Sequence, residues 1–170
     1  MCLNCHVVSV DVELNNLEAI RRACKRLGWQ FIENQNTYTW VGKWYDDSPV
    51  PRNLFPSDDP GDNEYCRVVH MSKNERVPYM NNILGKCTHA IKPSKYRGEI
   101  GLIQRGNKFI PIWDHFTDGL ETIHAENGMK GFLQAYAVER TKIETNTWNQ
   151  SYTETTLNDG SIMLEIPILE

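Results

Sequence analysis

Two cysteines and a histidine at the start of the chain have the spacing of a cofactor-binding motif. The run Cys2-Leu3-Asn4-Cys5-His6 spells Cys-x-x-Cys-His, the pattern that attaches c-type haem. Haem is normally attached outside the cytoplasm, and these residues lack the basic region and long apolar run of an export signal. We therefore expect neither haem nor any other cofactor.

Zinc is a better use of the same two thiols. Tetrahedral zinc takes four nitrogen or sulfur ligands, and Cys2 with Cys5 has the spacing of one half of such a site. Two pairs can supply the other half, although neither has the spacing of a standard zinc knuckle: Cys66 with His70, or Cys87 with His89. The odd number of cysteines, five, favours reduced thiols over a disulfide framework. We expect no bound metal and keep this zinc site as the alternative.

A short run of titratable residues provides the candidates for acid/base catalysis. Asp114 and His115 come at the end of a predicted strand, where alternation sends their side chains to opposite faces. With His89 they form the catalytic set to test if the protein is an enzyme. Residues in such places more often cap a strand, and the chain has no Gly-x-Ser-x-Gly element, His-Glu-x-x-His helix or phosphate-binding glycine loop. A protein that is not an enzyme is therefore favoured.

Three large aromatic residues alternate along residues 37–44. In a strand, Tyr38, Trp40 and Trp44 would share one face. Each of them alone fits a core position, but three exceed what a small sheet usually buries against one helix. An aromatic face suits a nucleobase, because stacking contributes about 1–3 kcal/mol per base. The pattern predicts a surface for a flat, nucleotide-like ligand.

Basic residues complete this predicted site. Arginine and lysine bind phosphate oxygens, and the arginine fork does so with two parallel hydrogen bonds. The alternative is a solvated basic rim around a packed core. The expected ligand-binding residues are Tyr38, Trp40, Trp44, Lys92, Arg97, Trp113, Tyr136 and Arg140, with Lys95 as a further phosphate candidate.

The elements that must position these residues alternate between strands and helices. Apolar residues at helical spacing predict a helix over 17–27, with Asn15-Asn16 as its cap, and a second one over 129–143. Turn residues at 105–108 and 158–160 predict two hairpins. The predicted strands are residues 6–14, 29–32, 37–44, 66–71, 87–92, 99–104, 109–114, 151–157 and 161–168. This order predicts an α+β fold, an antiparallel sheet with two main helices packed on one face.

Length and composition bound the class of protein. The 170 residues fit a single domain, interrupted by an irregular proline-rich insertion at about 46–63. With 40% hydrophobic and 24% charged residues, the chain is neither disordered nor a membrane protein. The net charge is -4 and the 18 basic residues are dispersed, which argues against DNA or RNA as a partner. We expect a cytoplasmic protein that does not bind membranes.

Several short motifs resemble one family. They are Leu27-Gly28, Gln35 to Trp44, Gly85-Lys86-Cys87-Thr88-His89-Ala90-Ile91, Glu99-Ile100-Gly101, Trp113-Asp114, Leu133 to Val138 and Asp159-Gly160-Ser161-Ile162. In combination they resemble a family of unknown function shared by phages, cyanobacteria and plastids, known there as a hypothetical conserved reading frame. The likeness is closer to the phage-type members. The pair Cys2 and Cys5 departs from the usual start of the family, so the resemblance gives these cysteines no role. The resemblance implies a phage origin and a place in the host cytoplasm, but no activity.

Together these observations favour a phage-encoded, non-catalytic protein that sequesters a nucleotide-derived ligand such as a defence signal. Pockets often form between subunits, so we expect a homo-oligomer. One alternative is an enzyme that hydrolyses or modifies such a nucleotide. Another is a module that contacts a host protein through residues 46–63.

Overall fold

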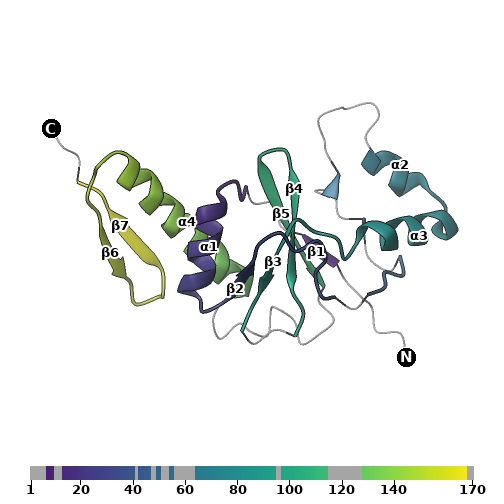
Figure 1. Cartoon of the computed structure of the whole chain (residues 1–170), viewed down its shortest axis with the longest axis horizontal. Helices are drawn as coiled ribbons and strands as arrows, with labels where there is room; N and C mark the ends of the chain where they lie inside the picture. The colour runs from purple at the N-terminus through teal and green to yellow at the C-terminus, as the bar shows by residue number, and fades with distance from the viewer. Residues whose placement is uncertain are drawn as a thin grey trace.

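A computed structural model of the chain describes residues 7–9, 13–40, 42–46, 49–50, 54–55, 64–94, 97–114 and 128–167. In chain order its helices and strands are β1 (Val7–Ser9), α1 (Leu17–Arg26), β2 (Gln30–Ile32), α2 (Glu64–His70), α3 (Lys73–Ile83), β3 (His89–Lys92), β4 (Ile100–Arg105), β5 (Lys108–Asp114), α4 (Gly128–Thr147), β6 (Thr153–Thr156) and β7 (Ile162–Glu165) (Figure 1). None of the helices in these ranges is long and apolar enough to cross a membrane.

One antiparallel sheet forms the centre of the molecule. Its five strands lie in the order β1, β5, β4, β3, β2, and every neighbouring pair is antiparallel. β4 and β5 form the predicted hairpin, and its turn residue Gly106 has a φ of 59° that favours glycine. The second predicted hairpin, β6 with β7, is a separate two-stranded sheet. The α+β class and the antiparallel sheet are confirmed.

The first helix begins and ends where the sequence indicates. The Asn16 side-chain oxygen accepts a hydrogen bond from the Ala19 amide at 2.9 Å and so satisfies a free donor of the first turn. After the helix, Gly28 adopts a φ of 67°, a conformation that costs glycine little. The apolar stripe of α1, including Ala19, Ile20 and Ala23, is buried.

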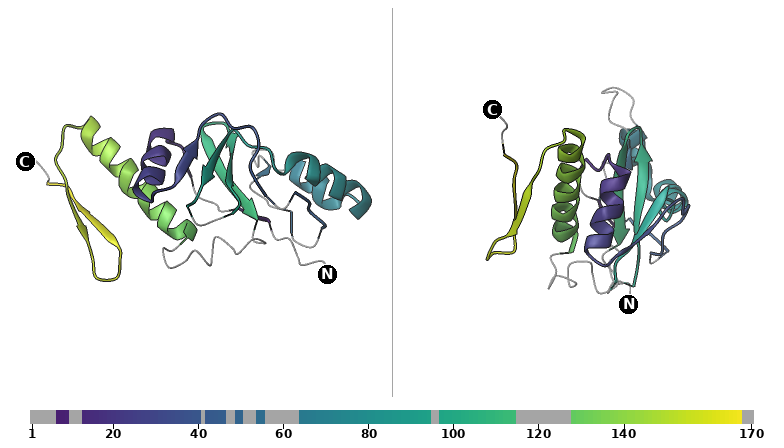
Figure 2. Two further views of the ribbon diagram at one scale, coloured as in Figure 1. Left: turned by 60° about the horizontal axis from the view of Figure 1, so that its bottom comes forward. Right: turned by 60° about the vertical axis from the view of Figure 1, so that its left-hand side comes forward.

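Helices cover both faces of the sheet (Figures 1 and 2). α1 and α4 pack on one face, where Ile20, Leu102 and Phe132 belong to one buried cluster, here called the α1/α4 core. This confirms the two main helices on one face. On the opposite face, α2 and α3 join Ile112 of the sheet in a second cluster, the α2/α3 core. The sheet is therefore the middle layer between two cores, and the β6–β7 hairpin lies on the outer side of α4.

Two predicted strands are wrong. Residues 66–71 lie mostly in helix α2, whose Val68 is buried on the sheet. Residues 37–40 and 42–44 form no strand, and among these described positions only Thr37 makes a β-bridge, to Lys86. In both segments the apolar residues that gave the strand-like pattern are buried in the α2/α3 core without forming strands. Most of the proline-rich insertion lies outside the described residues.

Candidate functional site

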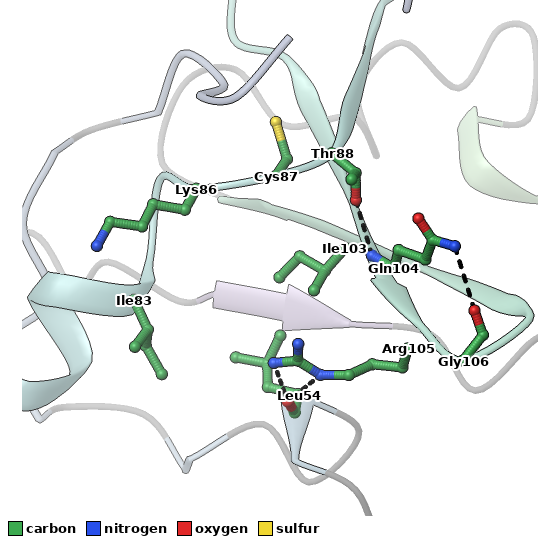
Figure 3. Close-up of a pocket in the computed structure, with 9 residues that line it drawn as sticks. All are labelled: Leu54, Ile83, Lys86, Cys87, Thr88, Ile103, Gln104, Arg105 and Gly106. Carbon is green, nitrogen blue, oxygen red and sulfur yellow. Dashed lines mark hydrogen bonds between the residues drawn. The ribbon is translucent and has the colours of Figure 1, made fainter. Parts of the chain in front are cut away.

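A cavity lies at the place where the pairing between β3 and β4 ends. β3 pairs with β4 only as far as His89 opposite Leu102, whereas β4 and β5 stay paired up to Arg105 opposite Lys108. The last residues of β4 therefore extend past the beginning of β3. A cavity of about 570 Å³ occupies this place, and its lining residues are Leu54, Ile83, Lys86, Cys87, Thr88, Ile103, Gln104, Arg105 and Gly106 (Figure 3).

Thr88 marks the point at which the ladder opens. Its backbone amide and its hydroxyl both donate to the Leu102 carbonyl, at 2.8 and 3.0 Å. The same hydroxyl accepts from the Gln104 amide at 2.9 Å, so a side chain takes the place that a strand backbone would occupy. A threonine hydroxyl can serve as both donor and acceptor, which this position requires. Beyond it the chain diverges from β4 and leaves space for the cavity.

Contacts with residues 36–40 hold the opposite wall, which runs from the end of α3 to β3. The Tyr38 and Cys87 amides donate to the carbonyls of Gly85 and Asn36, each at 3.0 Å. Gly85 has a φ of 82°, and a Cβ there would lie 2.5 Å from the Trp40 indole nitrogen. Only glycine combines this conformation with this close approach. The wall is therefore positioned before any ligand enters.

Among the described residues, two cations and no carboxylate line the cavity. Arg105 donates through Nε and Nη2 to the Leu54 carbonyl, at 3.1 and 2.9 Å, and extends over that residue (Figure 3). Lys86 lies on the other wall, where its ammonium group donates to the Asn82 side chain at 3.3 Å. A positive lining in a chain with a net charge of -4 favours an anionic ligand.

The cysteine of this cavity is not an activated nucleophile. The Cys87 thiol donates to the Gln35 carbonyl at 3.1 Å. Burial, and next the negative charge of Glu99, raise the pKa of Cys87 to about 11. Because the thiolate is the reactive form, this group is an inert thiol at neutral pH.

The three aromatic residues predicted to bind a base lie in the α2/α3 core. Trp44 is fully buried, and Asn81 of α3 holds its backbone on both sides, accepting from its amide at 2.7 Å and donating to its carbonyl at 2.8 Å. Tyr38 is 4% exposed and packs against Gly101, while Trp40 is half-buried beside it with ring centroids 6.5 Å apart. The structure brings these rings together as core, and none of them lines the cavity.

The remaining predicted ligand residues lie elsewhere. Trp113 and Tyr136 belong to the α1/α4 core, across the sheet from the first three. The Tyr136 hydroxyl accepts from the amides of Asn15 and Asn16, at 3.0 and 3.2 Å, and Arg140 contacts the same loop through Asn15. These side chains fix the start of α1 on α4.

The predicted phosphate contacts near β3 form part of a loop. Lys92 donates to the carbonyls of Arg97 and Gly98, at 2.8 and 3.2 Å, while the Arg97 side chain is exposed. Lys95 lies outside the described residues. The structure therefore does not gather the sequence-predicted ligand residues into one pocket.

The catalytic candidates are only partly described. His89 is 6% exposed, between the rings of Phe31 and Phe109, and its Nδ1 accepts from the Asn34 amide at 3.0 Å. Burial lowers the pKa of this imidazole. A neutral, enclosed ring whose Nδ1 is occupied has a structural role in the turn before residue 37. The side chain of Asp114, and His115 as a whole, lie outside the described residues.

The candidate zinc ligands that the structure describes do not gather into a metal site. Cys2 and Cys5 lie outside the described residues, and the remaining ranges contain no group of three or more His, Cys, Asp or Glu side chains that could hold a metal ion. His70 Nδ1 lies 2.6 Å from the Cys66 carbonyl, one turn earlier in α2. Cys87 packs against the α2/α3 core, whereas His89 contacts rings on the other face.

The sequence-predicted ligand residues do not include Lys86 and Arg105, the two cations of the cavity lining. The position of Arg105 at the end of a hairpin strand was recognisable from the sequence. Their common cavity depends on the register of β3 with β4, which no local pattern encodes.

No protein-family model, curated protein or solved structure matches this chain.

Proposed function

We propose that this protein captures a small, nucleotide-derived anion in the cavity beside β4 and does not convert it. The observation that carries the proposal is the pair of cations, Lys86 and Arg105, which are the charged residues in the part of the lining that the structure describes. Its volume of about 570 Å³ falls within the roughly 300–1,000 Å³ of typical small-molecule pockets. Leu54, Ile83 and Ile103 add the apolar surface against which an organic ligand can be buried.

The lining also favours binding over catalysis. Cys87 is a protonated thiol, and His89, the buried imidazole, is not among the lining residues. General acid/base catalysis requires a group that exchanges a proton near the working pH, and the lining residues that the structure describes include no histidine, aspartate or glutamate. The resemblance to phage-type proteins supports a viral role for such capture, with a host nucleotide signal as the ligand.

Thermal stability in the presence of nucleotides tests the proposal. A ligand at 100 times its dissociation constant stabilises the folded state by about 2.7 kcal/mol, which raises the melting temperature measurably. We expect nucleoside monophosphates or cyclic nucleotides to produce this shift and to be recovered unchanged by chromatography. The proposal fails if no nucleotide shifts the melting temperature, and a converted ligand would indicate an enzyme.

A matched pair of variants places the site. Lys86→Met removes a cavity cation, whereas Arg97→Gln removes an exposed cation of the predicted site that does not line the cavity. We expect Lys86→Met to weaken binding by about tenfold to hundredfold, since a charge-assisted hydrogen bond contributes roughly 1.5–3 kcal/mol. Arg97→Gln should bind as the unmodified protein does. The opposite result would place the ligand near β3.

A further inference from the structure

We infer that the outer edge of β6 is a dimerisation surface, where β6 of a second copy of this chain pairs antiparallel and completes a four-stranded sheet. The β6–β7 hairpin lies at one end of the molecule, on the outer side of α4 (Figures 1 and 2). The cavity is separate from it, because Leu54 and Ile83 of its lining pack on the α2/α3 side of the main sheet. The inference therefore goes beyond the proposed function and does not rest on it.

The register of the hairpin directs one row of backbone groups of β6 away from β7. Opposite residues of antiparallel strands alternate between pairs that exchange hydrogen bonds and pairs that do not. The Leu157 amide donates to the Ser161 carbonyl at 2.8 Å, so by alternation Thr155 bonds to β7. The amides and carbonyls of Glu154 and Thr156 then point outward, and no group of the described residues hydrogen-bonds them. An added strand would satisfy these groups and stabilise a hairpin of only two strands.

The side chains of β6 do not protect this edge. Natural proteins prevent edge pairing with exposed charges and proline, and β7 leads into such residues, the exposed Glu165 and Pro167. β6 has the sequence Thr-Glu-Thr-Thr. Its charged side chain, Glu154, turns toward the helices, where it pairs with Arg26 and Lys142. The other three side chains are exposed threonines, which are β-branched and favour strands. The β6 edge is therefore open to a further strand.

A second copy of β6 is complementary to this edge. Antiparallel pairing about a two-fold axis at Thr155 sets Glu154 opposite Thr156 of the second copy, and the reverse. The outward amides and carbonyls of both strands then bond to each other. Thr155 faces Thr155 of the second copy, a favourable cross-strand pair, and Glu154 does not face its own copy. The pairing therefore opposes no like charges.

Cysteine crosslinking of the full chain tests this register. At the axis, the two copies of residue 155 form a non-hydrogen-bonded pair with Cα atoms about 4.5 Å apart, which a disulfide can bridge. We expect Thr155→Cys to give a disulfide-linked dimer under oxidising conditions. Mass spectrometry of the linked peptides would separate this bond from bonds of the five native cysteines.

Met163→Cys is the matched control for the crosslink. Met163 lies opposite Thr155 within the hairpin and is also exposed, but one strand further from the axis. Its two copies would be separated by three strand spacings, about 14 Å, and should not crosslink. The inference is wrong if Thr155→Cys forms no such link. A link through Met163→Cys instead would place β7 at the interface.

Sedimentation equilibrium measures the dimer without a covalent bond. We expect the unmodified protein to be a dimer, and Thr155→Lys to weaken it by roughly tenfold, because like charges then face each other across the axis. Met163→Lys adds the same charge away from the axis and should leave the dimer nearly unchanged. Circular dichroism would verify that both variants are folded. A monomeric unmodified protein, or equal effects of the two lysine variants, would overturn the inference.

Discussion

His89, a catalytic candidate in the sequence, is a buried histidine that stabilises a turn in the structure. Its ring lies between Phe31 and Phe109, and its Nδ1 accepts a hydrogen bond from the amide of Asn34, a residue with a φ of 58°. Burial has the largest effect and lowers the pKa of this ring, while the charge of Glu33 raises it and that of Arg21 lowers it further. The folded state therefore prefers the neutral imidazole.

The pH dependence of stability should reveal this preference. An unfolded histidine takes up a proton below about pH 6.5, whereas folded His89 does so at a lower pH. His89 therefore contributes its full stability above pH 6.5 and loses it as the pH falls toward the folded pKa. We expect urea midpoints to decrease between pH 6.5 and 5, and His89→Gln, which keeps an acceptor without a titratable ring, to flatten this decrease. An unchanged slope in that variant would contradict the assignment.

Gly101 of β4 lies in close contact with a buried aromatic ring. A Cβ at this position would lie 2.3 Å from the Tyr38 ring, which is itself buried. Overpacking of this kind costs about 1–3 kcal/mol, and we expect Gly101→Ala to lower the free energy of unfolding by that amount. In a Tyr38→Leu background the same substitution should cost less, as a double-mutant cycle by urea denaturation would measure. Equal costs in both backgrounds would show that the contact with Tyr38 is not the cause.

Among the elements, the β6–β7 hairpin is attached mainly by charge. Arg26 of α1 and Lys142 of α4 surround Glu154 of β6, with Lys142 at 2.5 Å, and both also pair with Glu139. Arg26 first and then Lys142 lower the pKa of Glu154 to about 2. Neither core cluster includes a residue of the hairpin. The hairpin can therefore detach while the rest of the fold persists.

Hydrogen exchange should detect this weak attachment. Glu154→Gln removes the shared carboxylate, and we expect faster amide exchange across 153–165 with little change in the main sheet. The loss should be about 1 kcal/mol, because the four side chains are partly exposed and salt screens their interaction. Glu165→Gln removes a charge from the same hairpin outside this cluster and should leave exchange unchanged. Equal effects of the two variants would argue against the cluster.

Elements with strong local patterns were predictable, and those defined by distant contacts were not. α1, α4 and both hairpins follow from apolar spacing, the Asn16 cap and turn residues. α3 has no apolar stripe and contains Pro78 in its interior, so the capping box of Ser72 and Glu75 at its start was its main local helical signal. The aromatic residues at 38, 40 and 44 alternate as in a strand, but contacts with α3 and Gly101 decide their conformation. The cavity joins three separate segments, so its residues could not be grouped from sequence.

At the scale of the whole molecule, one sheet supports both cores. Ile91 of β3 and Leu102 of β4 belong to the α1/α4 core, while Ala90 of β3 and Ile112 of β5 belong to the α2/α3 core. Both cores pack on the same sheet, so unfolding the sheet disrupts both of them. We therefore expect one cooperative unfolding transition. Ile20→Ala on one side and Met80→Ala on the other should each lower the free energy of unfolding by about 2–5 kcal/mol. In both variants, the unfolding curves followed by fluorescence and by circular dichroism should still coincide. Two transitions would indicate independent units.

The unpaired end of β4 has a consequence for the behaviour of the protein in concentrated solution. Short stretches of uncovered strand invite pairing with other chains, and natural proteins place charged side chains there to prevent aggregation. Lys86 and Arg105 stand beside this stretch. The residues proposed to hold the anionic ligand would then also keep the protein soluble, so that neutralising both should promote self-association, and a bound ligand should suppress it by filling the gap.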